Sequence, residues 1–387
     1  FFGVPFLPYG LLVLAITFVG SVDYVPAILY RATQQPEKFF LFNFGSFALA
    51  SVLSLGMVLA GFGATGALIG QLAGGSIILL VAIVIAFRAR GETWYGHALR
   101  PALRFGLPLV PHQLATWGLR FSDRWLLGLL LLLPNGQLLP TGQRLAAVGA
   151  YSVGYQIGNL VAIVAMSFNA AWTPYFYRVA DEPEGPEIYR EIFTLTTLAF
   201  LWMALGLAST ASEVVGVISR PGYAPAAQVL PVIAFASVSQ ALYTMLVGVV
   251  LFRRQTAVLP LLTVASAFVN IVLNLSLIPR VGVMGAAWAT FAAYGLFALL
   301  TFAVATRLYP VRPDYPRLLS GLLLTLAGLA VARVLTPMDE PLLIRGLIHV
   351  AVTLAVGGVL LALARKPIGR LRLRMAAAQV RAQPVAV

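Results

Sequence analysis

Cysteine and charged residues are what this sequence lacks or has little of. None of its 387 residues is cysteine, so it has neither a disulfide framework nor a thiolate metal site. Only 10% of its residues are charged, whereas about a quarter are charged in a typical soluble domain. Hydrophobic residues make up 60% of the chain, and the mean hydropathy is +0.90. These values exclude an ordinary soluble domain and predict a polytopic membrane protein.

Motifs of enzymes and of cofactor-binding proteins are also absent from the sequence. It has no Walker loop, no zinc-binding motif and no nucleophile elbow. The three histidines, His97, His112 and His349, do not have the spacing of metal ligands. A membrane-bound glycosyltransferase or polysaccharide polymerase would need a sizeable segment outside the membrane that carries acids or bases, and the predicted loops are short. We therefore expect no enzymatic activity, no metal and no cofactor.

Long apolar runs are the main feature that is present. Runs of roughly 20 residues can cross a bilayer as helices, whereas barrel strands would show segments of about 10 alternating residues. The predicted fold class is therefore all-α. The sequence contains eleven candidate spans, at 8–30, 39–61, 64–87, 104–133, 146–172, 191–211, 227–251, 256–278, 284–306, 317–336 and 342–364.

The basic residues predict how these spans are oriented. Two of the 26 basic residues, Arg120 and Arg124, lie inside the fourth span. Of the others, 19 fall in one set of alternate loops together with the C-terminal tail, and five fall in the opposite set. Loops rich in Lys and Arg face the cytoplasm, so the C-terminus is expected there. This distribution explains the net charge of +13 by membrane topology. A nucleic-acid partner is not expected, because no basic cluster is interleaved with aromatic residues.

An internal repeat predicts two lobes. Both copies run in the same direction through the membrane, as in transporters whose lobes are related by an axis along the membrane normal. The first lobe has three spans where the second has six, so we expect a truncated N-terminus and 14 spans in the natural protein. The repeat has a constant offset of 219 residues, at which Gly63, Gly66, Ala67 and Arg88 correspond to Gly282, Gly285, Ala286 and Arg307.

The spans and the repeat together predict five parts of the chain. These are a partial N-terminal lobe of three spans (1–90), a cytoplasmic linker (91–103), a C-terminal lobe of six spans (104–308), two further membrane helices (309–365) and a basic cytoplasmic tail (366–387).

The fourth span carries the strongest candidate binding site. At 100° per residue, Gln113, Arg120 and Arg124 fall on one stripe of the helix, with Asp123 on its flank. Charged residues inside a span usually face a bundle interior or a cavity and mark a function. Guanidinium groups suit phosphate oxygens, so the arginines are candidates for binding a diphosphate, and Asp123 is expected to pair with Arg120. The alternative is a structural ion pair near the membrane interface.

Polar residues of three other spans are further candidates. Tyr155 and Asn159 lie one turn apart in the fifth span, and Asn270 and Asn274 lie one turn apart in the eighth. Their rings and amides suit sugar rings and hydroxyl groups, although ordinary hydrogen bonds between packed helices explain them equally well. Asp23 in the first span is a candidate for proton coupling, and a helix-end contact is the alternative reading.

The order of several segments resembles a known family. The segments LRFGLPLVPHQL, SDRWLLG, VGAYSVGYQIG, WTPYFYR and VMGAAWAT resemble polysaccharide transporters of the O-antigen flippase type, within the multidrug, oligosaccharidyl-lipid and polysaccharide exporter superfamily. The resemblance implies a flippase that moves polyprenyl-diphosphate-linked oligosaccharides across the bacterial cytoplasmic membrane by alternating access. Its implied partners are that substrate, membrane lipids, and polysaccharide polymerase or export machinery. A lipid II flippase and a multidrug antiporter of the same superfamily are the alternatives, and paired arginines favour an anionic substrate over a cationic drug.

Overall fold

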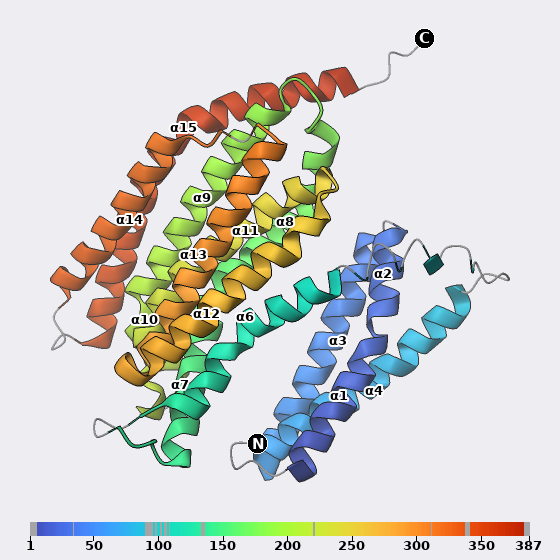
Figure 1. Cartoon of the computed structure of the whole chain (residues 1–387), viewed down its shortest axis with the longest axis vertical. Coiled ribbons are helices and arrows are strands. Elements are labelled where there is room, and N and C mark those ends of the chain that lie inside the picture. Colours follow the sequence, from blue (N-terminus) through green and yellow to red (C-terminus); the bar gives the residue numbers. More distant parts are fainter. Residues whose placement is uncertain are drawn as a thin grey trace. The chain divides into compact units, whose positions relative to one another are not determined.

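Helices form nearly all of the described part of the chain in the computed structural model (Figure 1). The structure describes residues 6–33, 35–89, 96, 99, 100, 103, 107, 109–132, 136–219, 221–310, 312–336 and 341–382. Within these residues there is no β-strand, and one isolated bridge joins Leu132 to Leu138. The all-α prediction is therefore confirmed. The chain divides into two compact units, Phe1–Pro101 and Ala102–Val387.

The first unit is built around a hairpin of two helices. Its elements are η1 (Phe6–Gly10), α1 (Leu11–Val22), α2 (Tyr24–Ala32), α3 (Pro36–Met57), η2 (Val58–Phe62) and α4 (Gly63–Ala89). α3 packs along α4 because α4 presents two glycines to it. A Cβ atom would lie 2.4 Å from the Ser54 nitrogen if placed on Gly70, and 2.7 Å from the Ala50 Cα if placed on Gly74. Small residues four apart let membrane helices approach closely in this way.

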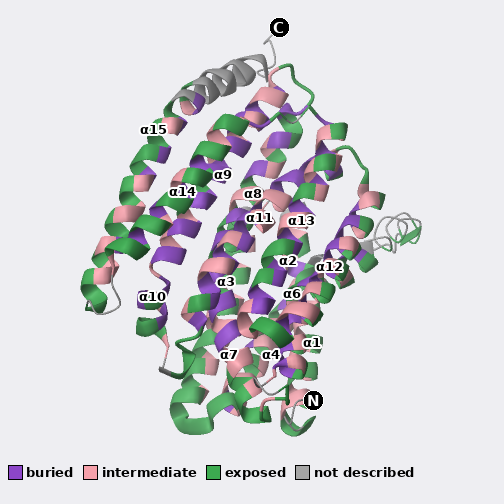
Figure 2. Cartoon of the chain, turned by 60° about the vertical axis from the view of Figure 1, so that its left-hand side comes forward, coloured by how far each residue is buried: buried purple, intermediate pink, exposed green. Residues whose placement is uncertain are grey.

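The second unit is a larger helical bundle. Its elements are α6 (Leu109–Leu130), α7 (Thr141–Gly158), α8 (Leu160–Val179), α9 (Gly185–Ser209), α10 (Ala211–Ile218), η3 (Pro221–Tyr223), α11 (Ala226–Phe252), η4 (Thr256–Val258), α12 (Leu259–Val281), α13 (Val283–Leu308), α14 (Tyr315–Leu335) and α15 (Leu342–Ala382). α11 packs against α7, α8, α9 and α13, while α6 packs mainly against α12. Figure 2 shows buried residues along α9, α11 and α13. α14 and α15 pack together and against α9.

Each of the eleven expected spans corresponds to a helix or to consecutive helices. Nine segments of the described chain are long and apolar enough to cross a membrane. One of them, Glu37–Arg88, has 52 residues and contains both α3 and α4. α6 is not among the nine because it carries Arg120, Asp123 and Arg124, and it ends at Leu130 rather than at residue 133 as expected. The fold is that of a multi-pass membrane protein.

The two copies of the sequence repeat share an unusual backbone conformation. Gly63 has φ 55° and ψ −139°, and Gly282 has φ 62° and ψ −136°. Each glycine stands directly at the start of a long helix, α4 or α13, and a positive φ of this kind is readily adopted only by glycine. The recurrence of glycine at an offset of 219 therefore reflects one turn that is used twice.

The distribution of basic residues predicts that the loops after α8, after α11 and before α14 are all cytoplasmic. Two ion pairs show that these loops lie together at one end of the second unit. Arg253, after α11, forms an ion pair with Asp181, after α8, at 3.3 Å. Arg190 in α9 forms another with Asp314, before α14, at 3.8 Å. Arg345, near the start of α15, is counted with the loops that are predicted to be non-cytoplasmic, and it forms an ion pair with Glu213 in α10 at 3.4 Å. These contacts therefore agree with the predicted division of the loops into a cytoplasmic and a non-cytoplasmic set.

Candidate functional site

α6 has a buried face and an exposed face, and both carry polar residues. The buried face includes Leu119, Asp123 and His112, whose Nδ1 atom lies 2.6 Å from the Thr263 hydroxyl oxygen in α12. The exposed face includes Gln113, Trp117 and Arg120. The predicted polar stripe is therefore divided between the packed core of the second unit and its surface.

Arg124 is held at the boundary between these faces. Its side chain is 17% exposed. Its Nε atom donates a hydrogen bond to the Ser152 hydroxyl at 3.3 Å, and its Nη1 atom donates one to the Arg120 carbonyl oxygen at 3.0 Å. These bonds do not use the Nη2 atom, so the guanidinium retains donors with which to bind an anion.

Asp123 is wholly buried and lies close to Arg124. Its Oδ1 atom is 4.0 Å from Arg124 Nη1. Its Oδ2 atom accepts hydrogen bonds from the hydroxyl groups of Tyr151 in α7 and, at 3.2 Å, Thr290 in α13. The prediction that Asp123 pairs with Arg120 is wrong, because burial turns the carboxylate inward while Arg120 stays exposed. Asp123 therefore joins α6 to two other helices and supplies a negative charge beside Arg124.

Tyr155 lies beneath the Arg124 guanidinium. The Arg124 Cζ atom is 4.3 Å from the centre of the Tyr155 ring, within the range of a cation–π interaction. The Tyr155 hydroxyl oxygen is 3.1 Å from that of Tyr294 in α13. Tyr155 is 3% exposed, so in this conformation the arginine, not the phenol, faces the surface. Asn159 is also buried and stands at the junction of α7 and α8.

Asn270 and Asn274 form a separate buried cluster with α6. The Ser122 hydroxyl donates a hydrogen bond to Asn270 Oδ1 at 2.7 Å, and Asn274 Nδ2 donates to the same oxygen at 3.0 Å. Both amides are fully buried, so in this conformation they lie between α12 and α6. The structure thus brings them to Ser122 and not to the exposed arginine.

Oxygen atoms suited to a cation are present in this buried region. Asp123 Oδ1 and Asn274 Oδ1 have no hydrogen-bond partner among the described residues. Carboxylate and amide oxygens can coordinate hard cations, but Asp123 Oδ1 already faces the cationic Arg124 Nη1 atom at 4.0 Å. Among the described residues, no group of three or more His, Cys, Asp or Glu side chains is arranged to hold a metal ion.

Asp23, the candidate coupling residue of the first unit, lies at the break between α1 and α2. Its side chain is half-buried, and its Oδ1 atom has no hydrogen-bond partner within the described part of the chain. This position is compatible with a contact at a helix end, which is the alternative explanation of Asp23. A role of Asp23 in proton coupling stays a prediction.

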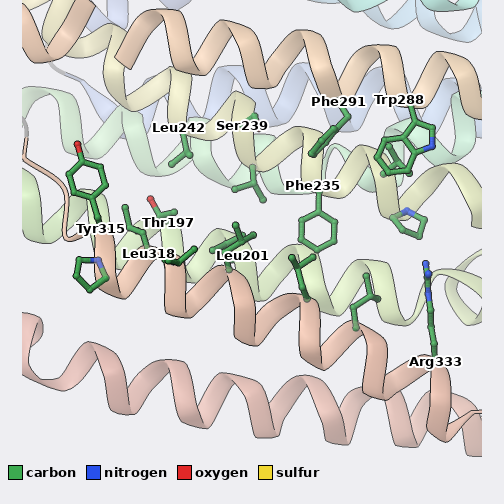
Figure 3. A pocket seen from close by; sticks show the side chains of 18 residues that line it. Thr197, Leu201, Phe235, Ser239, Leu242, Trp288, Phe291, Tyr315, Leu318 and Arg333 are labelled. Carbon is green, nitrogen blue, oxygen red and sulfur yellow. The ribbon is translucent and has the colours of Figure 1, made fainter. Parts of the chain in front are cut away.

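An apolar groove lies between α14 and the helices α9, α11 and α13 (Figure 3). Its volume is about 1200 Å³. Arg333 lies at one end and Tyr315 at the other, with Phe235, Leu201 and Leu318 between them. The lining is mostly apolar, with the Arg333 guanidinium at one end. Sequence patterns did not indicate the groove, because its lining comes from four helices.

Several residues of the arginine site were not predicted from the sequence. Thr290 and Tyr294 come from α13, far along the chain from Asp123 and Tyr155, and Ser152 is an ordinary helix residue by its sequence context. Tyr151 precedes Tyr155 by four residues and was not among the predicted site residues. The sequence indicated only that Tyr151 lies on the same face of the helix as Tyr155.

Comparisons with known proteins agree with this architecture. The profile of a family described as "polysaccharide biosynthesis protein" matches residues 1–228, more than half of the chain. A solved structure described as "Lipid II flippase MurJ, inward closed conformation" is similar with a TM-score of 0.65 and 15% identity, covering 90% of this chain and 73% of that chain. At this identity the likeness shows the fold. A search of curated proteins found no match. The family match and the helical membrane fold together place this chain in the polysaccharide biosynthesis protein family.

Proposed function

We propose that this protein is a flippase that moves polyprenyl-diphosphate-linked oligosaccharides from the inner to the outer leaflet of the bacterial cytoplasmic membrane. The observation that carries the proposal is the pair of arginines on α6. Arg124 is held by two hydrogen bonds and an aromatic ring, and Arg120, one turn earlier, is exposed. Two guanidinium groups one helical turn apart match the two phosphate groups of a diphosphate.

The apolar groove supports a substrate that is linked to a lipid. A polyprenyl chain is an uninterrupted hydrocarbon, and the groove lining is almost entirely apolar. The family to which the chain belongs supports a role in polysaccharide biosynthesis, and the fold similarity to a protein described as a lipid II flippase supports a transporter rather than an enzyme. We further propose that the protein has no enzymatic activity and that its C-terminus is cytoplasmic, as the basic loops favour.

Two sets of substrates are consistent with this site. Oligosaccharide repeat units for O-antigen, capsule or exopolysaccharide are favoured by the family match, and lipid II is favoured by the structural similarity. Both carry a polyprenyl diphosphate, so the arginine pair does not distinguish them. The distinction depends on the sugars.

The test is transport by the purified full-length protein in proteoliposomes. Vesicles would contain either a fluorescent polyprenyl-diphosphate oligosaccharide or fluorescent lipid II, and accessibility at the outer leaflet would report flipping. We expect the double variant R120Q/R124Q to abolish flipping while inserting into the membrane normally. R280Q, which removes an exposed arginine of α12, is the matched control and should flip at the wild-type rate. Undiminished flipping by R120Q/R124Q would refute the arginine assignment.

A further inference from the structure

The Arg124 side chain has three aromatic rings beside its guanidinium. Its guanidinium lies 4.3 Å from the Tyr155 ring centre, 5.6 Å from that of Tyr151 and 5.5 Å from that of Phe121. Arg120 has a single ring contact of this kind in the described chain, with Phe121 at 5.8 Å. The two arginines therefore differ in how firmly they are held.

Tyr155 makes the shortest of these contacts and is itself fixed. Its hydroxyl group meets the hydroxyl of Tyr294, and its ring centre is 6.0 Å from that of Tyr151. Gly154, beside it in α7, permits close packing on α11, because a Cβ atom there would lie 2.6 Å from the Ala226 carbonyl oxygen. The ring is thus a fixed surface beneath the Arg124 guanidinium.

A fixed guanidinium binds phosphate more tightly than a mobile one. An arginine side chain loses rotamer freedom when it binds, and that loss is avoided if the side chain is already ordered in the binding geometry. The Tyr155 ring orders the group through its face, which uses none of the N–H donors. Nε and Nη1 are oriented by Ser152 and the Arg120 carbonyl, so the Nη2 donors remain for the ligand.

We propose that Tyr155 is a positioning residue, which holds the Arg124 guanidinium flat so that it presents its free donors to one phosphate group of the substrate. This inference rests on the proposed function, because it assumes that Arg124 binds the diphosphate. Tyr155 acts through its ring and does not contact the sugars. Arg120, less constrained, adapts to the second phosphate group.

The test compares Y155F with Y155L in proteoliposomes that contain the fluorescent polyprenyl-diphosphate oligosaccharide. Initial flipping rates at several substrate densities give an apparent KM and a maximal rate. Y155F keeps the ring and should stay within about twofold of the wild-type KM, whereas Y155L should raise KM by roughly tenfold, the order expected for loss of a partly desolvated cation–π contact. Y189L removes another fully buried tyrosine, in α9, and should leave KM unchanged.

The same substitution in the R124Q background separates positioning from a structural role. With the guanidinium gone, Y155L should not raise KM further, whereas a purely structural residue would add its own effect. The assignment is overturned if Y155L has the wild-type KM, if Y155F is as impaired as Y155L, or if Y155L adds to R124Q. A wild-type KM and rate for R124Q itself would instead overturn the proposed role of Arg124.

Discussion

Tyr151 donates a hydrogen bond from its hydroxyl group to the carboxylate of Asp123, joining α7 to α6 inside the second unit. Thr290 of α13 donates to the same oxygen atom, so three helices meet at one buried charge. A buried carboxylate is costly unless hydrogen bonds and an opposite charge replace its water. Here the two hydroxyl groups and Arg124 do so, and the same contacts fix the helix that carries the arginine pair.

Removal of the Asp123 carboxylate should therefore destabilise the bundle. In D123A the Tyr151 and Thr290 hydroxyl groups lose their acceptor inside the protein, at a cost of about 1–3 kcal/mol. D123N retains an oxygen that accepts from Tyr151 and should be less destabilised. Thermal unfolding of the detergent-solubilised variants measures both effects. Equal unfolding temperatures for D123A and the wild-type protein would show that these hydrogen bonds contribute nothing to stability.

The two arginines should respond differently to replacement by lysine. Lysine lacks the planar fork, so at position 124 it cannot bond Ser152 and the Arg120 carbonyl while lying on the Tyr155 ring. R124K should lower the flipping rate at low substrate density roughly tenfold, equivalent to about 1.4 kcal/mol. Arg120 is exposed and contacts only one ring in the described chain, so R120K should stay within about threefold of wild type. Equal losses in the two variants would contradict this division of roles.

Hydrophobic patterning was sufficient to predict the helices of this fold. Apolar runs of bilayer length located a helix, or consecutive helices, at each of the eleven expected positions, because a membrane helix must satisfy its own backbone hydrogen bonds and cover about 30 Å. The repeat was also visible, because the turn at Gly63 and Gly282 needs a positive φ and so retains glycine. These features depend on local chemistry, which a sequence displays directly.

The partners of the polar residues could not be predicted in the same way. Tyr151 follows Asp123 by 28 positions and Thr290 follows it by 167, and no local pattern encodes which helices will meet. The sequence also did not show which face of each helix is buried in the bundle, because lipid-facing and core-facing residues are both apolar in a membrane helix. Asn270 and Asn274 were therefore predicted either to face a substrate or to make ordinary hydrogen bonds between helices, and in this conformation they lie fully buried against Ser122.

Gly285 in α13 should be far more sensitive to alanine than Gly295 in the same helix. A Cβ atom on Gly285 would lie 2.6 Å from both the carbonyl carbon and oxygen of Leu277 in α12, so the two helices would have to separate. Such overpacking costs about 1–3 kcal/mol. No heavy atom among the described residues outside the local helix lies within 4 Å of a Cβ on Gly295. G285A should therefore unfold at a lower temperature, whereas G295A should match or exceed wild type. The reverse order would refute the close approach of α12 and α13.

Tyr309 should make stability depend on pH in the alkaline range. It lies between the spans, and its hydroxyl group donates a hydrogen bond to the Ala180 carbonyl oxygen at 3.0 Å. Burial raises the pKa of Tyr309 to about 12, against an opposing effect of Arg253 and with a smaller contribution from Asp181. An unfolded tyrosine has a pKa of about 10. The folded state therefore favours the neutral phenol, and this contribution is complete below pH 10 and is lost as the pH rises to about 12.

Y309F tests this contribution because it keeps the ring and removes the titrating group. Phenylalanine also loses the bond to Ala180, so Y309F should be less stable than wild type below pH 10. Between about pH 10 and 12 the wild-type protein should lose stability faster, and the difference between the two proteins should shrink. Unfolding temperatures across this range give the difference directly, and the other tyrosines cancel because both proteins contain them. A difference that stays constant from pH 9 to 12 would show that Tyr309 titrates alike in the folded and unfolded states.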